Sequence, residues 1–356
     1  MARPIQATFD LAALKHNLAV ARRLAGGAST MAVIKANAYG HGLLRVAKAL
    51  GEAEGFALLE LDDAVRLREA GYRQRILLLE GCFTEGELPV AVHHQLTVMV
   101  HAREQLHMLQ ALPAKDKLEV FLKFNTGMNR LGFPVEQAGE VIEKTKSLPC
   151  IARIVLTTHF ADAEGPGGIQ RQMREFNSCV ARPDYELSLA NSAALLRFPE
   201  ARGNWVRPGL MLYGASPLQD ISAEKLGLKP VMTLKSEVIA IQKLKPGDTV
   251  GYGGVFTADH DMRIGVIACG YADGYPRQAA NGVSVLIEGT RVPIAGRVSM
   301  DMLCVDLTHV PHARVGSPVV LWGEGLPIEE VAAHAGTVSY ELMCALAARV
   351  PVREKA

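Results

Sequence analysis

Between residues 31 and 213, short apolar runs alternate with amphipathic stretches of helical periodicity. This alternation is typical of a parallel sheet built from βα units. We expect eight strands, at residues 31–36, 56–60, 75–81, 96–101, 118–124, 151–160, 185–191 and 205–213. Amphipathic segments such as 62–70 and 135–147 lie between them, and a helix over 11–24 precedes the first strand. Eight strands in about 190 residues predict an α/β fold of the (β/α)8 TIM barrel type.

The pattern changes after about residue 225. Strands are then expected at 231–241, 263–269, 283–287, 302–307 and 318–322, separated by Pro-Gly and Asp-Gly turns, with one helix at 328–335. We therefore expect two domains. A barrel covers residues 8–225 and a C-terminal, mostly-β domain covers 226–356, and residues 1–7 join the second domain.

Composition narrows the range of partners. The 356 residues are 49% hydrophobic and 21% charged, with a net charge of +1 and no basic stripe, which excludes nucleic-acid and membrane-surface binding in favour of a small-molecule substrate. The N-terminus does not resemble a signal peptide, and no stretch reaches the roughly 18 apolar residues of a membrane helix, so we expect a cytoplasmic protein. The six cysteines lack the close spacing of zinc sites, so we expect buried free thiols and no metal.

Lys35 is the first candidate for chemistry. It ends the first predicted strand and is followed by a turn punctuated by Gly40 and Gly42. An ammonium at such a junction is partly desolvated, which favours the free amine and Schiff-base chemistry with a carbonyl compound. Taken alone, the lysine is better interpreted as a side chain that extends from the strand end to the surface.

Other polar residues occupy equivalent places on the later strands. Active sites of TIM barrels lie at the carboxyl ends of the strands. Besides Lys35, the polar residues at or near these ends are Lys123, His159, Asn191, Ser192 and Arg207. Each is more often structural than catalytic, but their convergence on one mouth predicts a site.

Several motifs together resemble the alanine racemase family, the fold-type III enzymes that depend on pyridoxal 5'-phosphate. The N-terminal motifs are Ala32-Val-Ile-Lys35-Ala-Asn-Ala-Tyr39-Gly-His-Gly42, Asn125-Thr-Gly-Met-Asn-Arg130-Leu-Gly132, Thr158-His159-Phe160, Asn191-Ser192-Ala193 and Val206-Arg207-Pro-Gly209. Val250-Gly-Tyr252-Gly253, Gly270-Tyr271-Ala-Asp-Gly274 and Gly296-Arg297-Val-Ser-Met300-Asp301 follow in the family's order. The resemblance implies a barrel followed by a C-terminal β domain.

The resemblance also implies a two-base mechanism in a homodimer. Lys35 would carry pyridoxal 5'-phosphate and act as the base on one face of the substrate's α-carbon. Tyr252 of the partner subunit would be the base on the opposite face. Without the family context, Tyr252 would be interpreted as an aromatic residue in a glycine-rich turn.

The remaining cofactor contacts rest on the same resemblance. The phosphate would be bound by Tyr39, Ser192, Tyr340 and the backbone N–H groups of Gly209 and Leu210.

In the same way, Arg207 would face the pyridine nitrogen and keep it unprotonated, which favours racemisation, whereas a carboxylate there would suit a decarboxylase. His159 would lie near the ring and hydrogen-bond towards Arg207.

The family places the substrate carboxylate against Arg130 and the backbone N–H of Met300 of the partner subunit. Lys123 is a candidate for carbamylation, because two bare cations at Lys123 and Arg130 would repel each other. An unmodified, displaced lysine is the alternative. Asn125 stands where many members have aspartate, which makes this loop less negative. The entrance residues implied by the family are Tyr271, Arg297 and Asp301.

The main hypothesis is therefore the interconversion of L-alanine and D-alanine. A racemase of broader specificity and a fold-type III decarboxylase of diamino acids are the enzymatic alternatives. A pyridoxal-phosphate carrier protein on the same barrel would lack the second domain. The sequence is compatible with both supply of D-alanine for peptidoglycan and alanine catabolism.

Overall fold

The barrel is closed by eight parallel strands. In this computed structural model, which describes residues 3–279 and 281–355, the neighbouring strands are β2 (Ser29–Val33), β3 (Gly55–Leu58), β4 (Arg75–Leu78), β5 (Thr97–Val100), β6 (Leu118–Asn125), β8 (Ile151–Thr157), β9 (Glu186–Ser188) and β10 (Trp205–Val206). Pairing of β10 with β2 completes the ring, and β5 pairs with β6. The predicted (β/α)8 barrel is confirmed.

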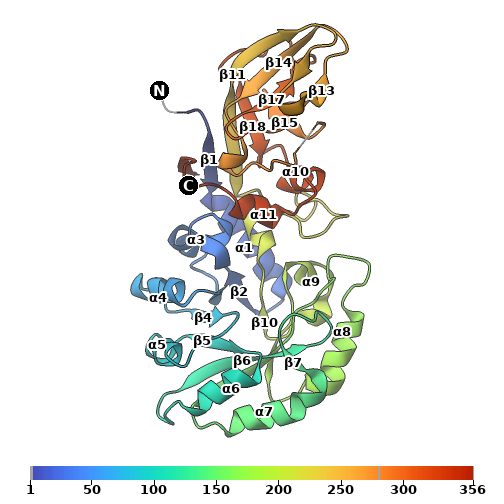
Figure 1. Cartoon of the computed structure of the whole chain (residues 1–356). Coiled ribbons are helices and arrows are strands. Elements are labelled where there is room, and N and C mark those ends of the chain that lie inside the picture. The colour runs from blue at the N-terminus through green and yellow to red at the C-terminus, as the bar shows by residue number, and fades with distance from the viewer. Residues whose placement is uncertain (1–2, 280, 356) are drawn as a thin grey trace.

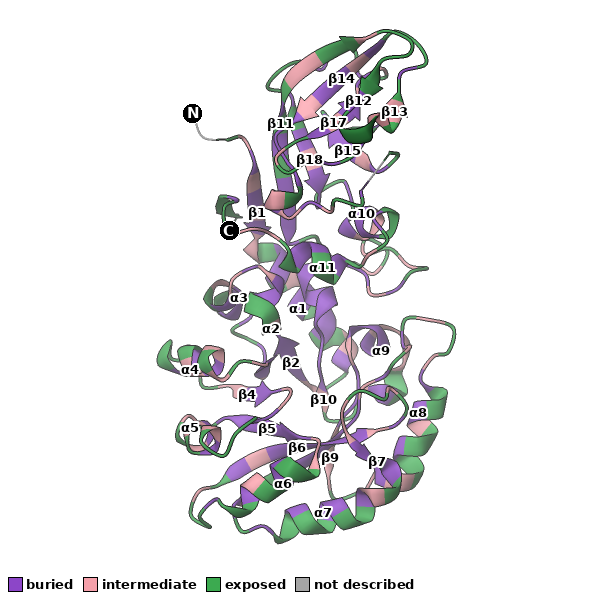
Figure 2. Cartoon of the chain, in the orientation of Figure 1, coloured by how far each residue is buried: buried purple, intermediate pink, exposed green. Residues whose placement is uncertain are grey.

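Helices surround these strands, with exposed outer faces on α7 and α8 (Figure 2). The helices are α1 (Leu11–Ala25), α3 (Leu43–Ala49), α4 (Leu61–Glu69), α5 (Glu87–His93), α6 (Arg103–Gln110), α7 (Ala138–Ser147), α8 (Gln170–Glu175) and α9 (Ser192–Arg197). The carboxylate of Asp10 caps α1 by accepting from the Ala13 N–H at 2.8 Å, and Gly26 ends the helix in a left-handed conformation. A short strand, β7 (Phe133–Pro134), pairs in parallel with the end of β6.

Ion pairs close the amino-terminal end of the barrel. Arg75 pairs with Glu119 at 2.7 Å, and its guanidinium lies 4.5 Å from the centroid of the Trp205 ring. Arg153 pairs with Glu186 at 3.2 Å. All five residues lie at or near strand starts, so this end is filled and the opposite end is left for a site.

The C-terminal domain is built on a mixed sheet. Its strands are β1 (Gln6–Asp10), β11 (Met232–Leu244), β14 (Met262–Ile267), β15 (Ser284–Ile287), β16 (Thr290–Pro293), β17 (Leu303–Asp306), β18 (Pro318–Trp322) and β19 (Val352–Lys355). A small pair, β12 (Thr249–Val250) and β13 (Phe256–Thr257), lies apart from this sheet. β1 pairs with β11 and β19, so both ends of the chain enter one sheet.

Two short helices, α10 (Ile328–His334) and α11 (Ser339–Cys344), lie between the strands of this domain and the barrel (Figure 1). The second domain is close to the barrel at α11: a Cβ atom on Gly40 would lie 2.3 Å from the Met343 carbonyl oxygen. The boundary at residue 225 stays a prediction.

Two smaller expectations are only partly met. The six cysteines are free, but Cys344 is exposed and Cys179 and Cys304 are half-buried, so the expectation of burial was wrong for these three. Among the described residues, no helix combines the length and the apolar character needed to cross a membrane.

Candidate active site

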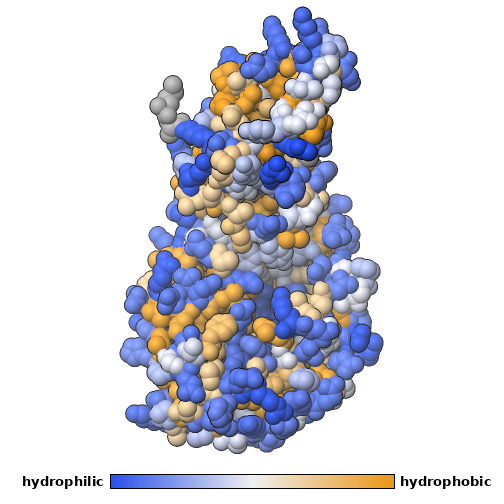
Figure 3. Space-filling model, viewed as in Figure 1, coloured by the Kyte–Doolittle hydropathy of each residue, from blue (hydrophilic) through white to orange (hydrophobic). Residues whose placement is uncertain are grey.

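A cavity of about 1180 Å³ opens at the carboxyl end of the barrel strands. The surface is hollowed between the barrel and the C-terminal domain (Figure 3). Residues predicted at the strand ends that line the cavity are Lys35, Lys123, His159, Asn191, Ser192 and Arg207, together with Tyr39, Arg130, Gly209, Leu210 and Tyr340. The structure thus brings these residues together around one space.

Lys35 is presented by a left-handed turn. Strand β2 ends at Val33, and the following turn, α2 (Lys35–Tyr39), has φ angles of 52°, 51°, 54° and 52° at residues 36–39. The expectation that the strand continues to Ala36 was therefore wrong, whereas Gly40 and Gly42 do follow in the turn, with φ angles of 77° and 96°. None of the four left-handed residues is glycine, so each costs about 1–2 kcal/mol that the surroundings must offset.

Local hydrogen bonds hold this turn. The Gly42 N–H donates to the Asn37 carbonyl oxygen at 2.9 Å, and the Leu43 N–H donates to Asn37 Oδ1 at 2.9 Å. Asparagine tolerates the left-handed region better than most residues because its short side chain can hydrogen-bond locally. Lys35 therefore enters the cavity from a turn whose backbone is fixed on its carboxyl side.

Three residues with hydroxyl groups, Tyr39, Ser192 and Tyr340, line the cavity together with Gly209, and we call them the hydroxyl cradle. Ser192 Oγ accepts from the Gly209 N–H at 2.8 Å. A Cβ atom on Gly209 would lie 2.7 Å from Tyr39 Oη, so only glycine fits against this hydroxyl. Tyr340, from α11, places its ring centroid 5.7 Å from that of Tyr39. Burial raises the pKa of Tyr39 and raises that of Tyr340 to about 12, so both hydroxyls are neutral donors.

Arg207 is buried and bound only to neutral oxygens among the described residues. Its guanidinium donates to the Ser188 carbonyl oxygen at 2.7 Å and to the Thr158 carbonyl oxygen at 2.8 Å. Burial lowers the pKa of Arg207 to about 10, so it remains a cation at neutral pH. No hydrogen bond in the described chain joins it to His159, so that expectation was wrong: these carbonyl oxygens are the acceptors instead.

The charged groups around Arg207 are mainly cations. Burial, followed by the charges of Arg207 and Arg130, lowers the pKa of Lys123 to about 8. Burial and then the charge of Arg207 lower the pKa of His159 to about 3, so its imidazole is neutral. Lys35 lines the same cavity, so this part of it favours an anionic guest, while the carboxylates of Glu164, Asp220, Glu329 and Glu330 line other parts.

The loop that carries Arg130 is capped by an amide. Asn125 Oδ1 accepts from the Asn129 N–H at 2.9 Å and from the Gly127 N–H at 3.1 Å. Asn125 Nδ2 donates to Asn129 Oδ1 at 3.0 Å, a bond that an aspartate could not donate. Asparagine at this position thus stabilises the turn through hydrogen bonds and adds no charge near Arg130.

Glu80 is a lining residue that sequence reasoning missed. It lies just after β4, and its carboxylate opposes the cations that lower the pKa of Lys123. Its position at the end of the predicted strand 75–81 was an available signal, because that strand end faces the same mouth.

Tyr340 is the one residue predicted from the C-terminal domain that lines this subunit's cavity in the described chain; the others do not line it. Tyr252 is 72% exposed and Met300 is 54% exposed, and neither is among the residues that line the cavity. Tyr271 lies beside Met300, because the Tyr271 N–H donates to the Ser299 carbonyl oxygen at 3.1 Å. Arg297 borders the Tyr252 turn: a Cβ atom on Gly253 would lie 2.9 Å from its Nη1. We define these four residues as the exposed loop face.

Comparison with known proteins identifies the family. The model of the alanine racemase N-terminal domain matches residues 9–217, and that of the alanine racemase C-terminal domain matches residues 231–354. The chain belongs to the alanine racemase family. An alanine racemase of Nitrosospira multiformis is 56% identical over 353 residues, covering 98% of this chain and 99% of the relative.

Two further relatives of this alanine racemase family member are named for different roles. A catabolic alanine racemase of Klebsiella aerogenes is 51% identical, with 99% of each chain covered. The crystal structure of the biosynthetic alanine racemase from Pseudomonas aeruginosa superposes with a TM-score of 0.97 at 44% identity, covering 100% of each chain.

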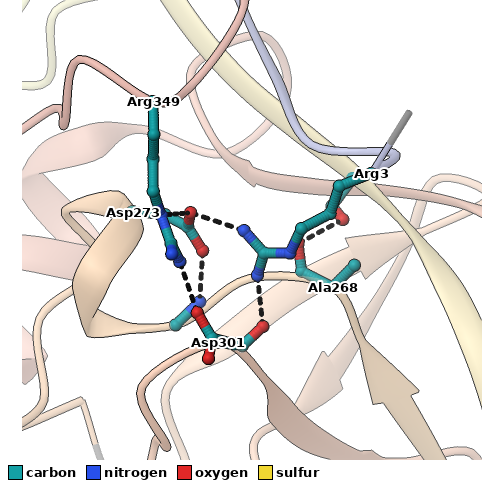
Figure 4. A network of polar contacts seen from close by, with 7 residues as sticks. Arg3, Ala268, Asp273, Asp301 and Arg349 are labelled. Atoms are coloured by element: carbon teal, nitrogen blue, oxygen red, sulfur yellow. Dashed lines mark hydrogen bonds and ion pairs between the residues drawn. The ribbon is translucent and has the colours of Figure 1, made fainter.

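In this family member, a buried carboxylate, that of Asp273, joins two arginines to the segment that precedes Tyr271 (Figure 4). The Asp273 side chain is fully buried and accepts from Arg3 at 2.6 Å, from Arg349 at 2.8 Å and from the Gly270 N–H at 2.9 Å. Arg349 also pairs with Asp301 at 2.6 Å. Burial opposes ionisation of Asp273, but the hydrogen bonds from the two arginines outweigh it and lower its pKa.

We expect Asp273→Asn to lower the free energy of unfolding by about 1–2 kcal/mol at pH 7, because a neutral amide accepts weaker hydrogen bonds from the two partly exposed arginines. The folded-state pKa of Asp273 is lowered, so its stabilisation is present above the unfolded pKa of about 3.9 and is lost as the pH falls through the folded value. Urea unfolding at pH 7 and at about pH 3 should show the difference between variant and wild type shrinking.

Asp63→Asn is the matched control, because Asp63 makes a local pair with the exposed Arg66. It should cost less than about 0.5 kcal/mol. Equal losses in the two variants, or a difference that does not change with pH, would contradict the role of Asp273.

Proposed function

We propose that this protein interconverts L-alanine and D-alanine with pyridoxal 5'-phosphate as cofactor, in a homodimer. The observation that carries the proposal is the convergence of Lys35, a hydroxyl cradle and a buried Arg207 on one cavity. A lysine amine can bond covalently to an aldehyde, and the cradle and the cations suit a dianionic phosphate. The cradle is a fit for this group because only glycine at position 209 leaves room for the Tyr39 hydroxyl.

When bound, pyridoxal 5'-phosphate supplies a conjugated ring that delocalises the electrons left on the α-carbon after a proton departs. Lys35 would hold the cofactor and then exchange a proton with the α-carbon on one face. Tyr39, Ser192 and Tyr340 would donate hydrogen bonds to the phosphate. The Gly209 N–H donates to Ser192 Oγ, so it would orient that hydroxyl, and Leu210 would add its backbone N–H.

Arg207 favours racemisation over the alternative decarboxylation. A guanidinium held by carbonyl oxygens keeps its protons, so it would donate to the pyridine nitrogen without protonating it. The ring then withdraws electrons less strongly, which limits side reactions of the carbanion. His159 lines the cavity as a neutral group and would pack near the ring without adding charge.

The substrate carboxylate would bind Arg130, which is exposed at the mouth. The second base would be Tyr252 of the partner subunit, with the backbone N–H of Met300 of the partner subunit as a further carboxylate donor. Support comes from the exposed loop face: its side chains are exposed in this subunit, and a dimer would bring them to the other cavity. Tyr271, Arg297 and Asp301 would then border the entrance.

Incubation of L-alanine with the holoenzyme in deuterium oxide tests the function. We expect D-alanine to appear with deuterium at the α-carbon, because the proton is exchanged during the reaction. Faster exchange with a larger amino acid would favour the broader racemase. Release of carbon dioxide and an amine would favour the decarboxylase. The assay applies equally to a biosynthetic and a catabolic role.

Mixed dimers test the shared site. Lys35→Ala and Tyr252→Phe should each abolish activity in homodimers. Random exchange of subunits makes about half of the dimers mixed, each with one competent site, so about a quarter of the wild-type activity should return. Failure to recover activity after exchange has been verified by mass spectrometry would contradict the contribution of Tyr252 in trans.

Lys123 is proposed to carry a carbamate. Its lowered pKa makes part of the amine neutral near pH 8, and a neutral amine can attack carbon dioxide, forming an N–C bond and releasing a proton. The resulting anion would relieve repulsion with Arg130.

Native mass spectrometry in bicarbonate at pH 8 should show one added carbon dioxide, and the adduct should decline by about pH 6 as the amine becomes protonated. Lys123→Arg is the control that should carry no adduct. An identical mass for wild type with and without bicarbonate would leave the unmodified lysine as the correct alternative.

A further inference from the structure

His41 is a buried imidazole just after the turn that presents Lys35, and it does not line the cavity. Its Nδ1 lies 2.8 Å from the Tyr39 carbonyl oxygen and 3.1 Å from the Ala38 carbonyl oxygen. Carbonyl oxygens can only accept, so Nδ1 carries the hydrogen. Within the described chain Nε2 has no hydrogen-bond partner, so the ring makes its hydrogen bonds through Nδ1–H alone.

Both acceptors of His41 belong to the left-handed turn. Ala38 and Tyr39 have φ angles of 54° and 52°. Such a conformation persists in residues other than glycine only where the surroundings impose it. A single N–H shared by two successive carbonyl oxygens does so directly, because it fixes the orientation of both peptide groups.

The imidazole itself is held by aromatic packing. Its ring centroid lies 4.9 Å from that of Phe9 and 4.8 Å from that of Tyr213. Tyr213 in turn donates to the Val33 carbonyl oxygen at 3.0 Å, at the end of β2. Burial lowers the pKa of His41 to about 4, so the ring is neutral and keeps one tautomer.

We propose that His41 is a positioning residue whose Nδ1–H, donated to the Ala38 and Tyr39 carbonyl oxygens, holds the left-handed turn and so places Lys35 and the Tyr39 hydroxyl at the cofactor site. Its link to the cofactor rests on the proposed function. The hydrogen-bond donor of His41 and the volume of its ring can be tested separately, since different substitutions at this position remove each of them.

Three variants make the test. His41→Asn keeps an N–H near the place of Nδ1 but loses volume, whereas His41→Phe keeps a ring and loses the donor. Phe9→Leu perturbs the packing around the ring without touching the donor. The readouts are the dissociation constant for pyridoxal 5'-phosphate added to the apoprotein, and hydrogen–deuterium exchange of the peptide that covers residues 36–43.

We expect His41→Phe to weaken pyridoxal 5'-phosphate binding about tenfold, the effect of one lost buried hydrogen bond, and to speed amide exchange at Gly40 and Gly42. His41→Asn should stay within about threefold of wild type in binding and match its exchange. Phe9→Leu should lower the melting temperature without changing either readout.

Wild-type values in His41→Phe, or equal losses in His41→Asn and His41→Phe, would overturn the proposal, because the donor would then not matter. If His41→Phe does not fold, His41→Gln replaces it: its amide reaches beyond the carbonyl oxygens, so parity with His41→Asn would overturn the proposal. Failure of wild type to bind pyridoxal 5'-phosphate would overturn the proposed function instead, and exchange at residues 36–43 would still test His41.

Discussion

The left-handed turn after β2 is the constraint on which the site depends. A strand that continued past Val33 would put Lys35 and Tyr39 on one face but about 13 Å apart, because a strand rises about 3.3 Å per residue. Four left-handed residues instead bring both side chains to one cavity. The turn is held from several sides, by the Asn37 side chain, by His41 and by the approach of Gly40 to α11. The C-terminal domain therefore helps to shape the barrel site.

Charge is the second organising feature of the cavity. Lys35, Lys123, Arg130 and Arg207 are gathered there, while His159, Tyr39 and Tyr340 are neutral. A buried cation is costly unless its hydrogen bonds are satisfied, and Arg207 meets this condition with backbone and hydroxyl oxygens. An anionic cofactor and a carboxylate substrate would offset the remaining charge, which links the stability of the site to what it binds.

Much of this arrangement could be predicted from the sequence, because the alternation of apolar runs and amphipathic helices identifies all eight barrel strands. The rim residues followed from their places at strand ends. The turn at residues 36–39 could not be predicted, since Ala and Tyr rarely adopt positive φ and no propensity indicates four such residues in a row. Helix α11 was also missed, because Ser339–Cys344 is too short for a periodic signal. The roles proposed for Tyr252 and Met300 would require a second subunit, which the geometry of one chain cannot reveal.

The central claim is that Lys35, presented by the left-handed turn, is the residue that binds pyridoxal 5'-phosphate covalently. Borohydride reduction of the holoenzyme, followed by proteolysis and peptide mass spectrometry, tests it most directly. The account predicts one reduced pyridoxyl-phosphate adduct per chain, on Lys35. Labelling of Lys123 in place of Lys35, or no labelled peptide from a protein saturated with pyridoxal 5'-phosphate, would contradict it.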